Sequence, residues 1–388
     1  MERDLTNVDK QRLLQLLKEM IQINSVNPIL DPKVKGETEL ADYLGNYMDN
    51  LGIEVKYQQL EGGRKNVIGI LKGTGNGKSL LLNGHLDTVS VENMPEPFNA
   101  KFENGLVYGR GAIDMKSGVA AIVGAIETLV NSKVRLSGDV ILTLVCDEEY
   151  ASIGSEKAVE EYTADAAIIT EPTDMRICVA HKGFTWSKIS VHGKAAHGSL
   201  PNEGIDAITK MGKVLIELDY LQQQVFPNKT HPLLGSPSIH ASLIEGGLGL
   251  STYPDHCELQ IERRLLPDET KEDVEKETEK LLDSIKSNDP QFDAEYEVFL
   301  FRPGLEVATD HPIVTTLNTS YEKILGKPSE LIGVTWWMDS ALFAAAGIPC
   351  VVFGPTGQGL HAAEEYVEFD SVVNSAKILI ETIIQFCK

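Results

Sequence analysis

The sequence predicts an α/β fold in which a mixed, mostly parallel sheet carries helices on both faces and a smaller domain is inserted. Between residues 52 and 181, short apolar runs alternate with stretches of helical periodicity, as in chains of βαβ units. Runs such as 140–146 are apolar apart from Thr143, which is typical of strands buried on both faces. With 388 residues, of which 42% are hydrophobic, the chain is long enough for two domains.

The main domain is predicted to come from both ends of the chain, because the α/β pattern stops after Gly183 and returns near His311. We therefore expect residues 302–388 to fold back onto residues 1–182. Apolar residues at helical spacing and short apolar runs define its elements. The predicted helices span 8–23, 37–51, 116–130, 312–325 and 370–386, and the predicted strands end near residues 83, 146, 170 and 353.

The inserted domain is predicted to span residues 183–301. Its strands alternate between apolar and polar residues, as expected when one face is exposed. The order of its elements, β-α-β-β-α-β, is that of a ferredoxin-like domain. Strands are predicted over 185–192, 238–244, 258–265 and 292–301, and helices over 206–221 and 268–287.

Composition excludes several classes of partner. The formal net charge of −22 argues against nucleic acid, which requires a basic surface. The longest apolar stretch, 119–126, is too short to span a membrane. The N-terminal residues 1–7 lack the basic and apolar regions of a signal peptide, and the five cysteines are scattered, as in reduced intracellular proteins. We therefore expect a cytoplasmic protein.

Acidic residues and histidines follow the predicted strands. In open α/β sheets the ligand crevice lies beyond the carboxyl ends of the strands, so these side chains are expected to meet at one edge. Oxygen and nitrogen ligands gathered there predict a metal site, with two ions that would offset part of the negative charge. The residues are His85, Asp87, Asp114, Glu148, Glu149, Glu171 and His361.

Taken singly, each of these residues also has an ordinary structural explanation. Asp114 lies in a glycine-flanked turn and suits a helix cap, and Glu148 suits an exposed acidic turn. His85 and Asp87 are two apart on one predicted strand, so their side chains share a face, and the carboxylate can accept the ring N–H. Successive strand residues point to opposite faces, so Glu148 and Glu149 are expected to differ: one can bind metal while the other acts as a general base. Three adjacent acids, starting at Asp147, repel one another unless a cation compensates them.

The order of these residues resembles that of the di-zinc amidohydrolases and peptidases. This family includes acetylornithine deacetylase, succinyl-diaminopimelate desuccinylase, aminoacylase and glutamate carboxypeptidase, and the resemblance covers nearly the whole chain. The motifs that carry it are Gly84-His-Leu-Asp87-Thr-Val, Gly109-Arg-Gly-Ala-Ile-Asp114-Met-Lys-Ser-Gly, Asp147-Glu-Glu149, Thr170-Glu171-Pro, Gly193-Lys-Ala-Ala-His197-Gly-Ser-Leu-Pro201 and Leu360-His361.

The resemblance implies a ligand set. His85 and Glu171 would hold one zinc ion, and Glu149 and His361 would hold the other. Asp114 would bridge the two ions. Two Zn²⁺ per subunit are therefore expected, and Co²⁺ or Mn²⁺ is able to replace them at nitrogen and oxygen ligands.

The resemblance also implies roles for residues beside the metals. Glu148 would be the general base, and Asp87 would orient the imidazole of His85. The bridging Asp114 would be followed by a cis peptide bond.

In the inserted domain, His197 would donate a hydrogen bond to the oxyanion, often in the partner subunit's site, which makes this a dimerisation (lid) domain. Arg264 would bind the substrate carboxylate, for which a guanidinium fork is suited, and its neighbour Arg263 is expected to be structural. A homodimer is therefore expected.

Two segments depart from the family pattern. Ser251 stands three residues before Pro254, where many relatives have Asn. Trp336 and Trp337 replace the small, hydroxyl-rich residues found before the aspartate in desuccinylases. They are either core residues or the wall of a substrate pocket, and such a wall would disfavour a long, charged acyl group.

The expected function is hydrolysis of the amide of an N-acyl amino acid, closest to acetylornithine deacetylase. Glu171 favours this reading, because aminopeptidase-type relatives tend to carry Asp there. The alternative is a carboxypeptidase or dipeptidase with the same site and a dipeptide as substrate. A third hypothesis, a silent metal-binding scaffold, is opposed by the intact Glu148, since a scaffold needs no base.

Overall fold

The structure is a computed structural model that describes residues 5–91 and 93–388. Residues 1–4, on which the expectation about a signal peptide partly rests, lie outside the described residues. The chain divides into two units. The first comprises Met1–Val179, Val307–Ile332 and Met338–Lys388, and the second comprises Ala180–Glu306 and Gly333–Trp337.

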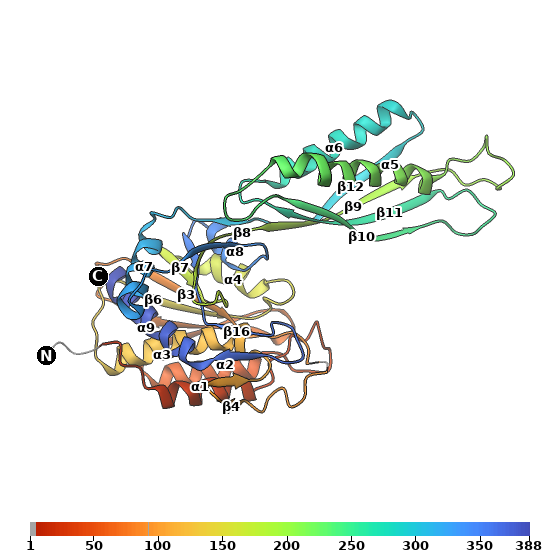
Figure 1. Cartoon of the computed structure of the whole chain (residues 1–388). Helices are drawn as coiled ribbons and strands as arrows, with labels where there is room; N and C mark the ends of the chain where they lie inside the picture. The colour runs from red at the N-terminus through yellow and green to blue at the C-terminus, as the bar shows by residue number, and fades with distance from the viewer. Residues whose placement is uncertain (1–4, 92) are drawn as a thin grey trace. The chain divides into compact units, whose positions relative to one another are not determined.

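The main sheet contains nine strands among the described residues (Figure 1). Their order is β1-β2-β6-β3-β7-β15-β8-β13, with β14 paired to β8. The four central strands, β6, β3, β7 and β15, are parallel, whereas the strands on either side pair antiparallel. The bounds are β1 Glu54–Gln59, β2 Lys65–Leu71, β3 Leu80–His85, β6 Val140–Val145, β7 Ala166–Ile169, β8 Ile177–His181, β13 Leu305–Glu306, β14 Leu331–Val334 and β15 Cys350–Val352.

The central strands are buried along their whole length, as their continuous apolar sequences predict. Leu82 of β3 lies between Leu142 of β6 and Ile168 of β7 in register. Because these strands are parallel, their carboxyl ends lie at the same edge of the sheet. The predicted position of the site at one sheet edge follows from this register.

Helices cover both faces of this sheet (Figure 1). Five helices and the sheet face beneath them form the largest apolar core. The most N-terminal of these helices is capped by Asp9, whose side chain accepts hydrogen bonds from two backbone N–H groups. Two shorter helices cover the opposite face. The five are α1 Lys10–Gln22, α2 Thr38–Asn50, α3 Ser117–Asn131, α7 Pro312–Leu325 and α9 Phe369–Phe386, and the two are α4 Ile153–Glu161 and α8 Ser340–Ala345.

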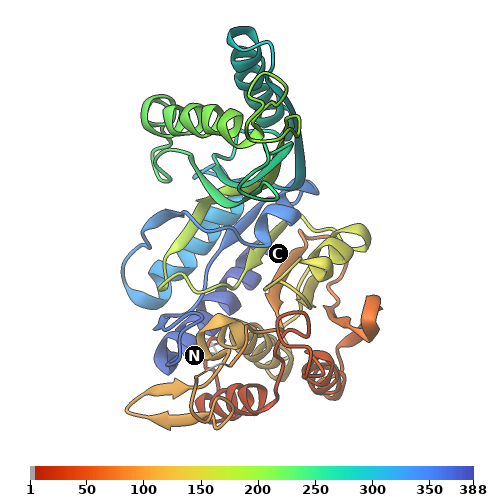
Figure 2. The same cartoon turned by 90° about the vertical axis from the view of Figure 1, so that its right-hand side faces the viewer.

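The second unit contains a four-stranded antiparallel sheet with two helices on one face (Figures 1 and 2). The strand order β10-β11-β9-β12 and the chain order β-α-β-β-α-β are those predicted for a ferredoxin-like domain. Helix α6 begins with a capping box between Thr270 and Asp273. The bounds are β9 Gly183–His192, α5 Ala207–Tyr220, β10 Ser238–Gly246, β11 His256–Leu265, α6 Lys271–Asn288 and β12 Asp293–Arg302.

The mixed α/β fold is confirmed, but a small third sheet was not predicted. Its four strands are two to three residues long, too short to show an alternating pattern. They are β4 Lys101–Glu103, β5 Leu106–Tyr108, β16 Gly357–Gln358 and β17 Tyr366–Glu368, in the order β16-β17-β5-β4. Among the described helices, none is both long enough and apolar enough to span a membrane.

Gly118 in the first turn of α3 fixes how closely this helix approaches the end of β7. A Cβ atom there would lie 2.1 Å from the backbone oxygen of Thr170. We predict that Gly118→Ala lowers the free energy of unfolding by about 1–3 kcal/mol through overpacking, measured by urea denaturation. The matched control is Gly212→Ala in α5, where a Cβ meets nothing within 4 Å and is expected to stabilise the helix by roughly 0.5–1 kcal/mol. Equal effects of the two changes would contradict the prediction.

Candidate metal centre

The carboxyl edge of the parallel strands carries the predicted residues. His85 is the last residue of β3, and Glu171 follows two residues after the end of β7. Glu148 and Glu149 lie in the turn after β6, and Asp114 lies just before α3. His361 lies in the loop between β16 and β17. All seven predicted residues of the sheet edge, Asp87 included, belong to the first unit.

Asp114 lies between two imidazoles. Its Oδ1 is 3.0 Å from His85 Nε2, and its Oδ2 is 3.3 Å from His361 Nε2. The two oxygens of one carboxylate therefore face two different histidines, which is the arrangement that a bridging ligand requires. The peptide bond from Asp114 to Met115 is cis, as the family resemblance implies.

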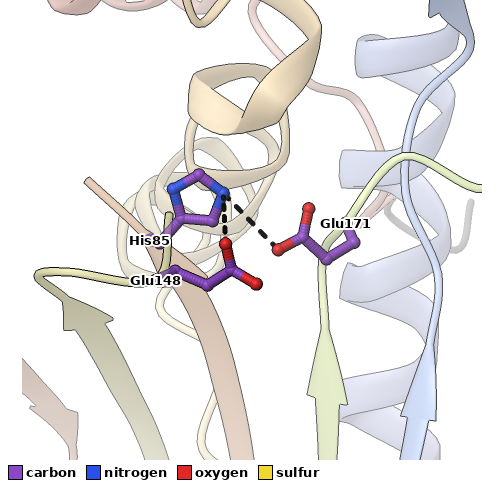
Figure 3. Close-up of side chains that lie close together, drawn as sticks. All are labelled: His85, Glu148 and Glu171. Carbon is purple, nitrogen blue, oxygen red and sulfur yellow. Dashed lines mark ion pairs between the residues drawn. The ribbon is translucent and has the colours of Figure 1, made fainter. Parts of the chain in front are cut away.

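Each histidine also faces a glutamate of its own. Glu171 Oε1 lies 3.5 Å from His85 Nε2, and Glu149 Oε2 lies 3.2 Å from His361 Nε2. Glu148 also approaches His85, with Oε2 at 4.0 Å from Nε2 (Figure 3). The side chains form two groups able to hold a metal ion, one with His85, Glu148 and Glu171 and the other with His85, Asp114 and Glu149.

The acids of this cluster are buried and lie close together. Burial and then the charge of Asp114 raise the pKa of Glu149 to about 7. Burial also raises the pKa of Glu148 and of Glu171 well above the usual range. Hydrogen bonds to Asp114 and Glu149 raise the pKa of His361 to about 10. The site therefore favours added positive charge.

The donor set fits divalent cations. Imidazole nitrogens and carboxylate oxygens are ligands of Zn²⁺, and they also suit Co²⁺ and Mn²⁺. Glu149 Oε1 is buried and has no hydrogen-bonding partner among the described residues. Since a buried carboxylate oxygen normally has a partner, this atom is available to a metal ion.

The argument that placed His85 and Asp87 on one strand face is wrong, because β3 ends at His85. The ring Nδ1 of His85 lies 2.9 Å from the backbone oxygen of Asp87 and 3.7 Å from its carboxylate Oδ1. The ring is thus oriented by a carbonyl oxygen, which fixes Nε2 as the atom that faces the acids.

The carboxylate of Asp87 instead holds the turn after β6. It accepts hydrogen bonds from the backbone N–H groups of Glu148 (3.1 Å) and Glu149 (3.2 Å). Asn27 donates a third, at 2.8 Å. The prediction that the two glutamates alternate along a strand is also wrong, since β6 ends at Val145 and both lie in this turn.

The third adjacent acid, Asp147, is compensated by an arginine. Its Oδ1 accepts hydrogen bonds from Arg64 Nη1 and from Asn27 Nδ2. Arg64 also donates to Glu37 at 2.7 Å, and all of these side chains are buried. The cation that offsets the charge of Asp147 is therefore the guanidinium of Arg64 and not a metal ion. Asp147 lies outside the metal cluster.

Sequence reasoning missed these supporting residues. Asn27, Arg64 and Glu37 lie 120, 83 and 110 positions from Asp147 along the chain, and nothing in a single sequence marks them as its partners. Asp339, two positions after Trp337, has no predicted role, yet its buried carboxylate accepts a hydrogen bond from Ser155 Oγ at 2.5 Å. Burial raises the pKa of Asp339 to about 6, and its charge in turn contributes to the raised pKa of Glu148.

His197 and Arg264 lie in the second unit. The Nδ1 of His197 accepts a hydrogen bond from the backbone N–H of Ser199 at 3.2 Å. Nε2 must then carry the proton of the neutral ring and is a donor. Arg264 donates from Nε to Glu262 at 2.8 Å, while its guanidinium lies 5.3 Å from the ring centre of Phe184.

Two residues of the second unit, Arg263 and Trp337, make contacts that indicate a structural role. Arg263 is buried and bonded to Glu269 and Glu277. Trp337 donates from Nε1 to the backbone oxygen of Pro303 at 3.0 Å, whereas the Trp336 side chain is 51% exposed. The two tryptophans therefore differ: Trp337 is anchored by a hydrogen bond, whereas Trp336 is largely open to solvent.

Residues 81–385 match the sequence profile of a family described as "Peptidase family M20/M25/M40". The N-formyl-4-amino-5-aminomethyl-2-methylpyrimidine deformylase of Bacillus subtilis (strain 168) is 31% identical, over 97% of this chain and 95% of its own. The acetylornithine deacetylase of Proteus mirabilis (strain HI4320) is 28% identical, over 98% of both chains.

Solved structures share the fold. One is the Bacillus subtilis YXEP protein, described as a dinuclear metal binding peptidase from the M20 family. It superposes with a TM-score of 0.76 and 17% identity, covering 97% of this chain and 98% of its own. At this identity the likeness concerns the fold alone.

Proposed function

Because the chain belongs to peptidase family M20/M25/M40, we propose that it hydrolyses the amide bond of a small N-acyl group on an amino acid, using two metal ions. One observation carries this proposal: the two oxygens of Asp114 face His85 and His361 separately. Each histidine then has a glutamate of its own, Glu171 or Glu149. The coarser statement, that the chain is a hydrolase of this family, follows from the family match alone.

In this proposal His85 and Glu171 would hold one ion, Glu149 and His361 would hold the other, and the carboxylate of Asp114 would serve both. Two bound Zn²⁺ ions would lower the pKa of a water molecule toward about 7 and polarise the amide carbonyl. Co²⁺ or Mn²⁺ is expected to replace Zn²⁺ at these ligands.

The protein's own groups move the proton. Glu148 lies on the His85 side of the centre, where it takes the proton of the attacking water and returns it to the leaving amine nitrogen. Asp87 keeps Glu148 in place, because the carboxylate of Asp87 accepts a hydrogen bond from the backbone N–H of Glu148. His197 donates from Nε2 to the oxygen that becomes negative during attack, a role that its Ser199 contact supports.

We assign to Arg264 the recognition of the amine half of the substrate, which is the amino acid released when the acyl group is removed. Its Nε is held by Glu262, and among the described residues its two Nη groups have no hydrogen-bonding partner. A pair of parallel N–H groups suits the carboxylate of an amino acid. We also propose a cytoplasmic location, which the five buried free cysteines support.

A second candidate is removal of a formyl group from an aminomethylpyrimidine. The 31% identity to a deformylase with that substrate favours it. Formyl and acetyl groups are both small, so the two candidates differ mainly in the amine half. The peptidase alternative is supported by the description of the family and by structural neighbours of low identity.

The proposed base, Glu148, is tested by substitution. We expect Glu148→Gln to lower kcat/KM by about 10²–10⁴-fold, because the amide cannot take a proton, while metal content stays at the wild-type value. Rates and inductively coupled plasma analysis of bound metal measure both quantities. A loss of bound metal in this variant would instead make Glu148 a ligand, and activity that survives would remove it from the mechanism.

The substrate is tested by a panel with defined Zn²⁺, Co²⁺ or Mn²⁺. We expect N-acetylornithine to be hydrolysed faster than a dipeptide or an N-succinyl amino acid, measured as kcat/KM. Arg264→Met should raise KM for N-acyl amino acids, because their carboxylate loses its partner, and should leave hydrolysis of the formylpyrimidine unchanged. Hydrolysis of dipeptides alone would decide for the peptidase alternative, and no hydrolysis of any amide would reject the proposal.

We further propose that the chain is a homodimer that associates through β10 and α5. β10 is an edge strand of the second sheet, and exposed apolar side chains follow along it and on α5. Such an edge is an aggregation site unless another chain covers it. The exposed residues are Leu243, Ile244, Leu248 and Leu250 from the strand and its loop, and Ile208, Ile216 and Tyr220 from the helix.

We predict that Leu243→Lys combined with Ile216→Lys gives a monomer, measured by sedimentation velocity, because two charges would be buried in the interface. If His197 acts in the partner subunit's site, this monomer also loses activity. Phe299→Lys on β12, the opposite edge, is the control and should remain dimeric. A monomeric wild-type chain would contradict the proposal.

A further inference from the structure

Glu365 is a buried carboxylate that holds the segment leading to Asp114. Its Oε2 accepts hydrogen bonds from Arg110 Nη1 at 2.6 Å and from the backbone N–H of Gly111 at 3.0 Å. Its Oε1 accepts from the backbone N–H groups of Ile113 at 2.9 Å and of Asp114 at 3.2 Å. Four donors on one carboxylate fix the backbone of residues 111–114 against residue 365.

Arg110 holds the loop that carries His361. Besides its bond to Glu365, it donates from Nη2 to the backbone oxygen of Ala362 at 3.0 Å and from Nε to that of Ser90 at 3.1 Å. Ala362 directly follows His361 in the chain. The side chains of Arg110 and Glu365 are 3% and 0% exposed, so water does not compete for these bonds.

The imidazole of His361 depends on this support. Its side chain is 56% exposed, compared with 1% for His85, so few packing contacts hold it. The loop is also tightly folded: a Cβ at Gly359 would lie 1.9 Å from the backbone oxygen of Glu364. The strands on either side, β5 and β17, pair at Tyr108 and Tyr366, which places the two supported segments side by side.

We propose that Arg110 and Glu365 are a positioning pair that holds His361 at a fixed distance from Asp114 and thereby sets the affinity of the second metal position. The inference rests on the proposed two-metal function. It deepens that function, because the contact of Arg110 with Ala362 supports only the metal position that includes His361. The pair joins segments 255 positions apart in the chain, each of which carries one ligand of that position.

Arg110→Lys isolates the role in positioning. A lysine keeps the charge opposite Glu365, but its single nitrogen cannot hold the oxygens of Ala362 and Ser90 as well. Residues that orient metal ligands typically contribute about 10–100-fold to metal affinity. We therefore expect the affinity for the second Co²⁺ ion to fall by about that factor, with the first unchanged, in calorimetric titration of the metal-free chain. Glu365→Gln removes the charge opposite Arg110 and weakens the bonds to residues 111–114. Because Asp114 is proposed to serve both ions, this second variant is expected to weaken binding of the second ion more than that of the first.

The matched control is Arg263→Lys. Arg263 is also a buried arginine bonded to two partners, but it lies in the second unit, so both Co²⁺ affinities should stay at the wild-type values. A second comparison uses His361→Ala. If Arg110 acts through His361, adding Arg110→Lys to the His361→Ala variant should not change the affinity for the remaining ion further. The effects of two substitutions do not add when one residue acts through the other.

The outcomes separate this inference from the function on which it rests. A wild-type chain that binds fewer than two Co²⁺ ions rejects the two-metal centre and this inference with it. If the wild type binds two ions and both variants bind them with unchanged affinities, only the positioning role is rejected. Equal weakening of both ions by Arg110→Lys also overturns it, because that result indicates general damage to the fold. Selective loss of the second ion, abolished in the His361→Ala background, supports it.

Discussion

The repulsion between buried carboxylates at one edge of the main sheet is the constraint on which the site depends. Asp114, Glu149 and Glu171 lie within reach of two imidazoles, and burial raises the pKa of both glutamates. Such a group is unfavourable unless positive charge is supplied and the acids are held by strong hydrogen bonds. The surrounding structure supplies the hydrogen bonds, and the proposed metal ions supply the charge.

Two buried arginines serve the segments that carry these acids. Arg64 pairs with Asp147 and Glu37 beneath the turn after β6, and Arg110 pairs with Glu365 beside the turn that leads to Asp114. Neither arginine has a contact with the ligand carboxylates among the described residues. Each neutralises an acid outside the cluster, so that the cluster itself keeps its negative charge for cations.

Much of the fold was predictable because it follows from local patterns. Continuous apolar runs identified β3, β6 and β7, and helical spacing identified α1 and α9. The parallel order of the central strands then placed His85, Glu171 and their companions at one edge. Local sequence patterns do not reveal which side chains pair when they lie far apart in the chain, as Arg110 and Glu365 do. They also do not fix the end of a strand to within one residue. For that second reason, the strand-face arguments for Asp87 and Glu148 were wrong, although both residues lie at the site.

The discontinuity of the first unit has a consequence for biosynthesis. Its sheet is interrupted after β8, and β15 joins beside β7 only after the whole second unit has been translated. A nascent chain that has emerged as far as Arg302 contains His85, Asp114 and Glu171 but lacks His361. The complete set of proposed ligands therefore exists only after the second unit has been translated, and binding of both proposed ions requires the segment that follows it.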